Sequence, residues 1–276
     1  MKKILLIGSS GFIGSYLKKD LKDKYKLICP SNRKNFDITN YNKVNNVLKK
    51  NVDIIINLSG QVSKSQMYET IIKGNTNIIK AVKILKRRPK IFYISTTLVY
   101  GFSNKILDES SRTNPYSKYA KFKKKGEELF LKSNLDYKIL RLANVYDQDK
   151  KGIVKNIINS IIKKKKLEVT NLNASRNYIH VEDLSKIILR MLESKLKFKL
   201  YNVVNENFTI KQIIEFIEKR LKLKVDIYNY NNKLKLLSSQ KIKIGKIYKE
   251  IDFQPKIKLK SFILNKLKNE IKFLKK

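Results

Sequence analysis

The chain has 276 residues, of which 42% are hydrophobic, which is enough for one large domain or for a domain with an appended lobe. Its one cysteine, Cys29, excludes an internal disulfide and a cysteine-rich metal site, and no apolar run approaches the roughly 20 residues of a membrane span. We therefore expect a cytoplasmic protein that holds no metal.

The net charge is +39, because 62 lysine and arginine residues face 23 acidic ones. Such an excess is typical of proteins that bind nucleic acid or anionic membranes. Here it is almost all lysine, it is spread along the whole chain, and no basic run is interleaved with aromatic residues as a stacking platform would be. We interpret it as a solvated surface, which does not favour a nucleic-acid partner but should attract an anionic substrate.

The N-terminus carries the first motif. Residues 2–8, KKILLIG, form an apolar run that ends in glycine, as in a buried strand of a parallel sheet, and an amphipathic stretch follows at 15–25. Strand, glycine turn and helix in this order are typical of a dinucleotide-binding turn. Gly8 permits the tight turn, Gly11 lets backbone N–H groups approach a pyrophosphate, and Gly14 lets the helix pack on the strand. We expect this turn to bind the cofactor through Gly8, Ser10, Gly11, Phe12, Ile13 and Gly14.

Strands and helices then alternate along the chain. Apolar strands are predicted at 25–29, 52–60, 90–97 and 137–146, and helices lie between them at 40–50, 69–88 and 114–132. This alternation predicts an α/β fold, a Rossmann-type doubly wound parallel sheet with a smaller C-terminal substrate-binding lobe. We expect the cofactor-binding domain to span 1–147, with 176–205 returning to it, and 148–276 to be mainly the substrate-binding lobe.

The segment after the second predicted strand bears on the choice of cofactor. An NAD enzyme usually has Asp or Glu there, about 20 residues past the glycines, to accept a hydrogen bond from the ribose 2′-OH. The segment at 29–39, CPSNRKNFDIT, has no acid before Asp37, and Ser31, Asn32, Arg33 and Lys34 would instead suit the 2′-phosphate of NADP. We predict NADP and keep NAD as the alternative, since in so lysine-rich a chain Arg33 and Lys34 could be ordinary surface residues.

Two tyrosines lie near the start of the predicted helix at 114–132. Only residues three or four apart share a helix face, and Tyr119 has Lys123 at this spacing whereas Tyr116 has Ala120. A tyrosine followed by lysine one turn later can exchange a proton with a carbonyl group. In this chain the spacing alone decides little, because Tyr146 has a lysine at the same distance.

Seven segments together carry a family resemblance. They are GSSGFIG at 8–14, DIT at 37–39, IKGNTNIIKA at 72–81, ISTTLVYG at 94–101, YAKFKKKGE at 119–127, RLANVY at 141–146 and RNYIHVEDL at 176–184. In order and spacing the chain resembles the extended short-chain dehydrogenases, also called the NAD-dependent epimerase/dehydratase family, which act on nucleotide sugars. The resemblance covers nearly the whole chain.

The resemblance implies a set of catalytic residues. Tyr119 and Lys123 match the family's catalytic pair, Thr96 matches the Ser or Thr that bonds the reacting oxygen, and Tyr116 becomes a wall residue of the site. A phenol has a pKa of about 10, so proton exchange near neutrality needs a lowering of about three units, which the Lys123 ammonium and an oxidised nicotinamide should supply.

The resemblance also implies ligand contacts. Asn144 matches a residue beside the substrate, and Arg176 matches an arginine that grips the diphosphate of a nucleotide sugar, which suits its planar fork. His180, the single histidine, is expected to be structural, near the anchoring Asp183. Besides the glycine turn, the cofactor should contact Arg33, Asp37, Leu58, Tyr119 and Lys123, and the substrate should contact Thr96, Asn144 and Arg176.

Departures from the family pattern narrow the reaction. Dehydratases of the family follow the Thr with Asp-Glu, and here Thr97-Leu98 stands instead. The absence of an acid after the second strand and the short chain favour reduction of a nucleotide-linked 4-keto-6-deoxysugar, with an NAD-dependent 4-epimerase as the alternative. Asn57, Ser59-Gly60 and Asp147 also depart from the pattern and should reshape the sugar pocket.

Other partners follow from the same reasoning. An NADP-binding regulatory or RNA-associated protein would keep the fold without catalysis, but the intact Thr96, Tyr119 and Lys123 argue against that class. We expect a homodimer with a nucleotide-diphosphate sugar as substrate. The amphipathic, basic stretch at 261–276 favours packing on the substrate lobe, and a weak peripheral membrane contact is the alternative.

Overall fold

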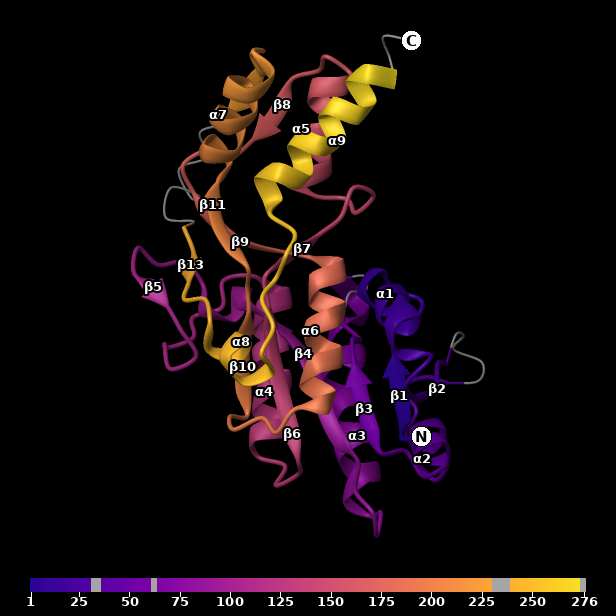
Figure 1. The fold of residues 1–276 in the computed structure, drawn as a ribbon. Coiled ribbons are helices and arrows are strands. Elements are labelled where there is room, and N and C mark those ends of the chain that lie inside the picture. Colours follow the sequence, from indigo (N-terminus) through magenta and orange to yellow (C-terminus); the bar gives the residue numbers. More distant parts are fainter. Residues whose placement is uncertain (31–35, 61–63, 230–238, 274–276) are drawn as a thin grey trace.

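The structure is a computed structural model of the chain, and it describes residues 1–30, 36–60, 64–229 and 239–273. Its centre is a six-stranded parallel sheet of order β10-β6-β4-β3-β1-β2 (Figure 1). The strands are β1 (Lys3–Ile7), β2 (Lys26–Ile28), β3 (Ile54–Asn57), β4 (Lys90–Thr96), β6 (Tyr137–Leu142) and β10 (Leu200–Val203). The predicted Rossmann-type fold is therefore confirmed.

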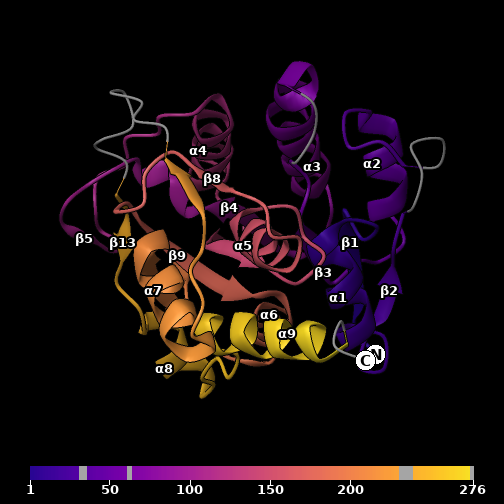
Figure 2. The same cartoon turned by 90° about the horizontal axis from the view of Figure 1, so that it is seen from above.

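Helices cover both faces of this sheet. One face carries α2 (Tyr41–Leu48), α3 (Gly74–Lys83) and α4 (Lys118–Leu131), and the other carries α1 (Phe12–Leu21), α6 (Val181–Glu193) and α8 (Lys246–Ile251). Figure 2 shows α2, α3 and α4 on one side and α1 and α6 on the other. Each face has its own apolar core, since successive strand residues point to opposite faces: Leu6 belongs to the core under α1, and Leu5 to the core under α2.

A second lobe lies beyond the carboxyl ends of the strands (Figure 1). Its core is formed around three helices, α5 (Ile153–Ile162), α7 (Ile210–Leu221) and α9 (Leu259–Phe273). Its strands are β7 (Asn144–Tyr146), β8 (Leu167–Val169), β9 (Ser175–His180), β11 (Glu206–Thr209) and β12 (Ile227–Asn229), and β13 (Lys241–Ile242) pairs with β5 (Ile106–Leu107). Because β9 precedes α6 and β10, the chain crosses from the lobe to the central sheet and back.

Two predicted elements differ from the structure. The strand predicted at 137–146 is two strands, because β6 pairs with β4 and β10 whereas β7, beyond Ala143, pairs with β9. The helix predicted at 69–88 is a π-helical segment, Tyr68–Lys73, followed by α3. At their junction a Cβ on Gly74 would lie 2.9 Å from Ile38, so close packing there requires glycine. The short helical segments Lys64–Gln66 and Thr97–Tyr100 complete the described elements.

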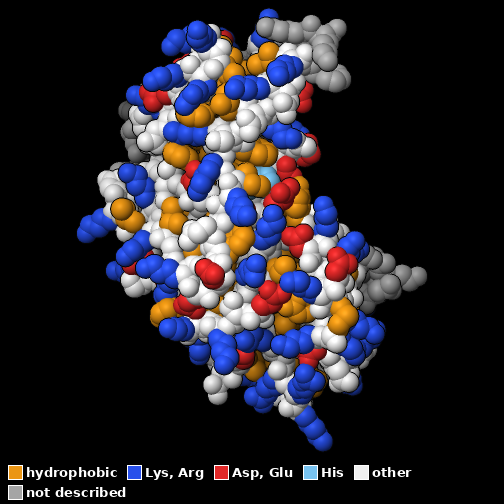
Figure 3. All heavy atoms as spheres, viewed as in Figure 1, with side chains coloured by type: hydrophobic (Ala, Val, Ile, Leu, Met, Phe, Trp, Pro, Cys, Tyr) orange, Lys and Arg blue, Asp and Glu red, His pale blue; other side chains and the backbone are white. Residues whose placement is uncertain are grey.

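The surface reflects the composition. Lysine and arginine side chains are spread over the face in Figure 3, with acidic and apolar side chains between them. α9 packs Leu259, Ile263 and Leu267 into the core of the lobe, where they are fully buried. Within the described ranges, no helix combines the length and the apolar character that crossing a membrane would require.

Candidate active site

A cavity of about 1100 Å³ lies at the carboxyl ends of the central strands. Most of the residues expected to bind ligands line it: Gly8, Ser10, Gly11, Phe12, Ile13, Gly14, Asp37, Leu58, Thr96, Tyr119 and Asn144. Lys123 and Arg176 are not among the lining residues. Arg33 and its neighbours 31–35 lie outside the described residues, so the predicted contact to a 2′-phosphate stays a prediction.

The glycine turn has the geometry that a dinucleotide requires. Gly8 has φ +83°, and Gly11 N donates to Gly8 O at 3.0 Å, which closes the turn before α1. A Cβ on Gly14 would lie 2.2 Å from Gly8 O, so only glycine allows the helix to pack this closely on the turn. The N-terminus of α1 therefore faces the cavity, where its backbone N–H groups fit a pyrophosphate.

Thr96 and Tyr119 both line the cavity. Thr96 is the last residue of β4, and its Oγ1 accepts a bond of 3.3 Å from Leu98 N. Ser117 caps α4 by accepting from Ala120 N at 3.2 Å, which starts the helix just before Tyr119. Tyr119 is half-buried, whereas Tyr116 precedes the helix, is 67% exposed and is outside the lining. We expected Tyr116 to form a wall of the site, but it is not among the residues that line the cavity.

Lys123 is held by backbone oxygens under Tyr119. Its Nζ donates to Ser59 O at 2.9 Å and to Ile94 O at 2.8 Å, and lies 5.9 Å from the centre of the Tyr119 ring. The side chain is only 2% exposed. A Cβ on Gly60 would lie 2.6 Å from this Nζ, so the glycine at 60 makes room for the lysine.

Burial dominates the protonation of both groups. It lowers the pKa of Lys123 to about 7, although Glu127 opposes the shift. It raises the pKa of Tyr119 to about 12. The expected lowering of the phenol pKa is therefore not supplied by the residues of the chain, because Lys123 directs its ammonium at two carbonyl oxygens and the phenol is desolvated. The structure presents Tyr119 as a protonated donor at neutral pH.

Asn57 supports the loop that holds Lys123. Asn57 is fully buried at the end of β3, and its Oδ1 accepts from Ser59 N at 3.0 Å and from Ser59 Oγ at 2.6 Å. Its Nδ2 donates to Asn75 Oδ1 at 2.7 Å. These two departures from the family pattern thus act together on the carbonyl that Lys123 contacts. The sequence identified Asn57 and Ser59 as departures from the family pattern, but it did not predict that Ser59 O accepts a hydrogen bond from Lys123.

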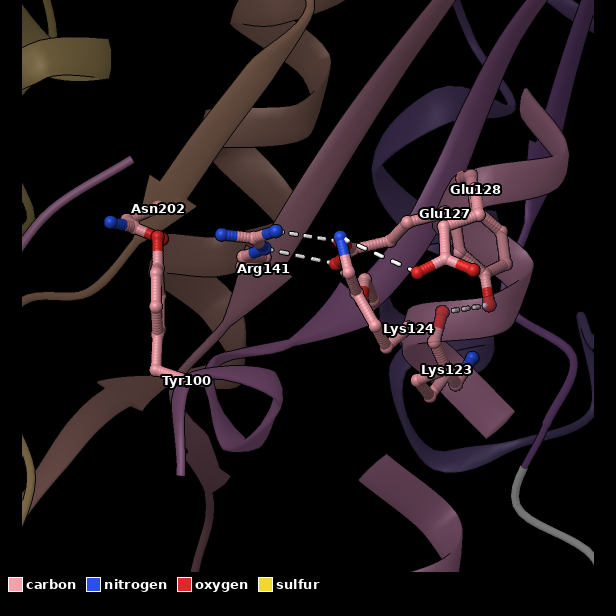
Figure 4. A network of polar contacts seen from close by, with 9 residues as sticks. Tyr100, Lys123, Lys124, Glu127, Glu128, Arg141 and Asn202 are labelled. Atoms are coloured by element: carbon pink, nitrogen blue, oxygen red, sulfur yellow. Dashed lines mark hydrogen bonds and ion pairs between the residues drawn. The ribbon is translucent and has the colours of Figure 1, made fainter. Parts of the chain in front are cut away.

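A buried ion pair lies one helical turn beyond Lys123 (Figure 4). Arg141 of β6 donates to both carboxylate oxygens of Glu127, from Nε at 2.9 Å and from Nη2 at 2.6 Å. Ser95 Oγ donates to the same carboxylate at 2.6 Å, and the Arg141 guanidinium lies 4.6 Å from the centre of the Tyr100 ring. The two parallel hydrogen bonds from Arg141 to Glu127 anchor α4 to the sheet and so help to position Tyr119 and Lys123 on that helix.

A second polar cluster joins the lobe to the end of β4. Thr97 Oγ1 donates to Asn177 Oδ1 at 2.9 Å, and Asn177 Nδ2 donates to Gln240 Oε1 at 2.8 Å. Gln240 Nε2 donates to Thr97 O at 3.0 Å and to Gly101 O at 2.7 Å. Thr97 is 1% exposed, so its side chain faces the protein while Leu98 lines the cavity. The sequence did not predict a role for Gln240 or Asn177, because their contacts join segments that are far apart in the chain.

The expected substrate residues lie on neighbouring strands of the lobe. Asn144 of β7 donates from Nδ2 to Asn177 O at 2.9 Å and lines the cavity. Arg176 of β9 is half-buried over the Phe102 ring, 5.8 Å from its centre. It is on the same face of β9 as Tyr178, which lines the cavity, so a ligand that extends past Tyr178 would reach it.

His180 lies at the junction of β9 and α6. It is buried, and its Nδ1 accepts from Glu182 N at 3.3 Å, which caps the helix. Burial lowers its pKa below the usual value. Asp183 Oδ2 accepts from Ile257 N at 2.8 Å and so ties α6 to the segment before α9. Both contacts are structural, as expected. Among the described residues, no group of three or more His, Cys, Asp or Glu could hold a metal ion.

A Rossmann sheet with a glycine turn beside a large cavity is typical of proteins that bind a dinucleotide. Comparison with protein families identifies the group. A model of the NAD dependent epimerase/dehydratase family matches residues 4–204, and the chain belongs to this family.

Similar proteins include enzymes with several reactions. A GDP-6-deoxy-D-talose 4-dehydrogenase of Aggregatibacter actinomycetemcomitans is 26% identical over 231 residues, covering 78% of this chain and 79% of the relative. The dTDP-glucose 4,6-dehydratase of Bacillus anthracis, solved with NAD, is 22% identical with a TM-score of 0.83, covering 99% of this chain and 97% of the other. RMD of Pseudomonas aeruginosa, solved with NADPH, is 19% identical with a TM-score of 0.80, covering 99% and 100%. The two solved structures share the fold.

Proposed function

We propose that the protein is a reductase that uses NADPH to reduce a nucleotide-linked 4-keto-6-deoxysugar. The position of Thr97 carries this proposal. Its side chain is bonded to Asn177 inside the protein, and Leu98 is the next residue that lines the cavity. The two positions where the family's dehydratases hold an acid and a base therefore offer neither. Among the described residues that line the cavity, the acidic ones are Asp37 and Glu69.

Two of the similar proteins support reduction at carbon 4 of a nucleotide-linked deoxysugar with NADPH. The GDP-6-deoxy-D-talose 4-dehydrogenase acts, by its name, at carbon 4 of a nucleotide-linked deoxysugar, and RMD of Pseudomonas aeruginosa was solved with NADPH. Asp37 lines the cavity, and its Oδ1 accepts from Thr39 N at 2.9 Å and from Thr39 Oγ1 at 2.8 Å, so the backbone turn at 37–39 fixes the position of this side chain.

In this reaction Tyr119, Thr96 and Lys123 would each have a separate role in reducing the keto group. When bound, the reduced nicotinamide supplies a hydride to the keto carbon. Tyr119 donates its phenolic proton to the keto oxygen, and burial keeps that proton in place at neutral pH by raising the pKa of the phenol to about 12. Thr96 Oγ1 lies at the end of β4, where its hydroxyl can donate to the same oxygen. The Lys123 ammonium, 5.9 Å from the centre of the Tyr119 ring, would stabilise the phenolate that this transfer leaves.

Binding at the nucleotide end would orient the sugar. Arg176 is on the same face of β9 as Tyr178, which lines the cavity, and its guanidinium could bind the diphosphate with two parallel bonds. Asn144 would contact the sugar from the neighbouring strand. Binding energy gained away from the reacting carbon then aligns the keto group with Tyr119.

A 4-epimerase is the second candidate, because the same Thr96, Tyr119 and Lys123 would serve a reversible hydride transfer with retained NAD. The two differ in stoichiometry. A reductase consumes one NADPH for each sugar, whereas an epimerase restores its cofactor in every turnover. The test is to follow NADPH absorbance while the purified protein converts a panel of nucleotide-linked 4-keto-6-deoxysugars and hexoses.

Stoichiometric loss of NADPH with the keto sugars supports the reductase. Interconversion of hexose epimers without net loss of NADPH would replace it with the epimerase. Absence of turnover on every nucleotide sugar would instead favour a cofactor-binding protein without catalysis.

A further inference from the structure

The loop at residues 147–152 lies against the start of α1. It follows β7 and precedes α5, and Lys150, Lys151 and Gly152 line the cavity together with Phe12 and Ile13. Residues 11–14 form the glycine turn and the first turn of α1. A segment from the lobe thus meets the dinucleotide-binding turn across one wall of the cavity.

One hydrogen bond fastens this loop to α1. The phenol of Tyr16, one turn into the helix, donates to Asp147 Oδ2, and the other carboxylate oxygen accepts from Gln148 N. Burial and the bond to Asp147 both raise the pKa of Tyr16, so the phenol keeps its proton and remains a donor. Asp147 is one of the positions that departs from the family pattern, where glycine is common. A glycine could not make this bond.

The fastened loop places a cation over the first residue of α1. Lys150 Nζ lies 5.0 Å from the centre of the Phe12 ring, and the side chain is half-buried. A cation over an aromatic face is attracted to it, which gives this lysine a preferred position. The backbone N–H groups of the same helical turn are the ones that fit a pyrophosphate.

Lys150 lines this wall of the cavity among other charged residues of the same loop. The loop is formally neutral, with Asp147 and Asp149 against Lys150 and Lys151. The Asp147 carboxylate is occupied by Tyr16 and Gln148 N. The backbone oxygen of Asp149 accepts from Lys155 Nζ at 3.3 Å, which draws that end of the loop toward α5. A dianionic group at the start of α1 would lie against the wall of the cavity that Lys150 lines.

We propose that residues 147–152 form a clamp that sets Lys150 on the pyrophosphate of the nicotinamide cofactor, and that the bond between Tyr16 and Asp147 holds the clamp in place. The clamp rests on the proposed use of a nicotinamide dinucleotide, but not on the reaction. Since NADH and NADPH share the pyrophosphate, the clamp tightens both and does not discriminate between them.

The test is calorimetric titration of the full chain with NADPH and with NADH. Lys150→Gln should weaken both affinities about fivefold, the value of a partly screened charge pair, and leave their ratio unchanged. Tyr16→Phe should weaken both about twofold to threefold, and should add little in the Lys150→Gln background, because the two residues act as one unit. Lys19→Gln is the matched control, since it removes the same charge from an exposed position of α1 that does not line the cavity.

Three results would overturn the clamp. They are a change below about twofold in Lys150→Gln, an equal loss in Lys19→Gln, and a loss of GDP and UDP binding in Lys150→Gln with NADPH binding intact. The last outcome would assign the loop to the substrate. Thermal unfolding of each variant confirms that the fold is retained. The titration measures binding without turnover, so the clamp and the reductase can be tested separately. If Lys150→Gln binds NADPH more weakly than the wild type, but the wild type reduces no sugar, the clamp is upheld and the reductase is rejected. A wild-type protein that binds neither dinucleotide overturns both.

Discussion

Lys123 Nζ donates a hydrogen bond of 2.9 Å to the backbone oxygen of Ser59, which joins the helix of the Tyr119 pair to the loop after β3. A second bond, of 2.8 Å to Ile94 O, joins the same ammonium to β4. The lysine is therefore positioned by three elements at once. Its freedom to move toward a ligand is small, and its charge is almost fully removed from water.

We expect the stability contribution of Lys123 to depend on pH. Burial lowers its pKa to about 7, whereas an unfolded lysine titrates near 10.4, about three units higher. Between these values the unfolded chain binds one proton more, so wild-type stability rises with pH across this window. Lys123→Met removes the effect. We consider the free energy of unfolding of Lys123→Met minus that of the wild type. This difference should be largest near pH 6 and lower by about 2 kcal/mol at about pH 9, because only the wild type gains stability as the pH rises.

Urea denaturation of both proteins at the two pH values measures this change. The methionine leaves Ser59 O and Ile94 O without their donor, so the absolute difference between the proteins is not the readout. A stability difference that stays constant between the two pH values contradicts the lowered pKa.

We expect Gly60→Ala to disturb Lys123. Gly60 has φ +135°, and an added Cβ would lie 2.6 Å from Lys123 Nζ. The backbone strain alone costs roughly 1 kcal/mol. Gly245→Ala is the control, because Gly245 has φ +121° and an added Cβ meets nothing within 4 Å. Both variants should lose stability, and only Gly60→Ala should also lower turnover, by about tenfold or more. Equal turnover in the two variants would show that Lys123 tolerates displacement.

We expect Tyr119 to carry the proton transfer and Tyr116 not to. Tyr119→Phe removes a phenolic donor that lines the cavity and should lower kcat by about a hundredfold or more, with the affinity for NADPH nearly unchanged. Tyr116→Phe, at a side chain that is 67% exposed, should change kcat by less than about twofold. Steady-state kinetics with the sugar identified as substrate gives both values. Similar losses at the two positions would reject the assignment.

We expect Glu127→Gln to destabilise the fold by about 3 kcal/mol, because Arg141 would keep a buried and uncompensated charge. Glu127 is fully buried and Arg141 is 3% exposed. Glu128→Gln is the matched control at the next residue, whose side chain is 48% exposed and lies 3.9 Å from Lys124 Nζ. The control should lose less than about 0.5 kcal/mol. Urea denaturation compares them, and equal losses would mean that the buried pair adds little beyond surface charge.

Much of the fold follows from local pattern in the sequence. The apolar run before Gly8 and the alternation of strands and helices predict the parallel sheet, because a buried parallel strand is apolar on both faces. The spacing of Gly8, Gly11 and Gly14 predicts a turn whose closest contact, a Cβ of Gly14 at 2.2 Å from Gly8 O, requires glycine. The spacing of Tyr119 and Lys123 places both on one face of α4.

Other features depend on residues far apart in the chain. No local signal divides 137–146 at Ala143, since the division arises from pairing of β6 with β4 and of β7 with β9. Gln240 meets Thr97 across 143 positions of sequence, and Tyr16 meets Asp147 across 131. Lys123 was expected to help lower the pKa of Tyr119, but the residues of the chain raise it, because desolvation depends on every atom packed around the phenol. Periodicity and spacing are properties of a short segment and can be read from it, whereas burial and long-range pairing exist only once the whole chain has folded.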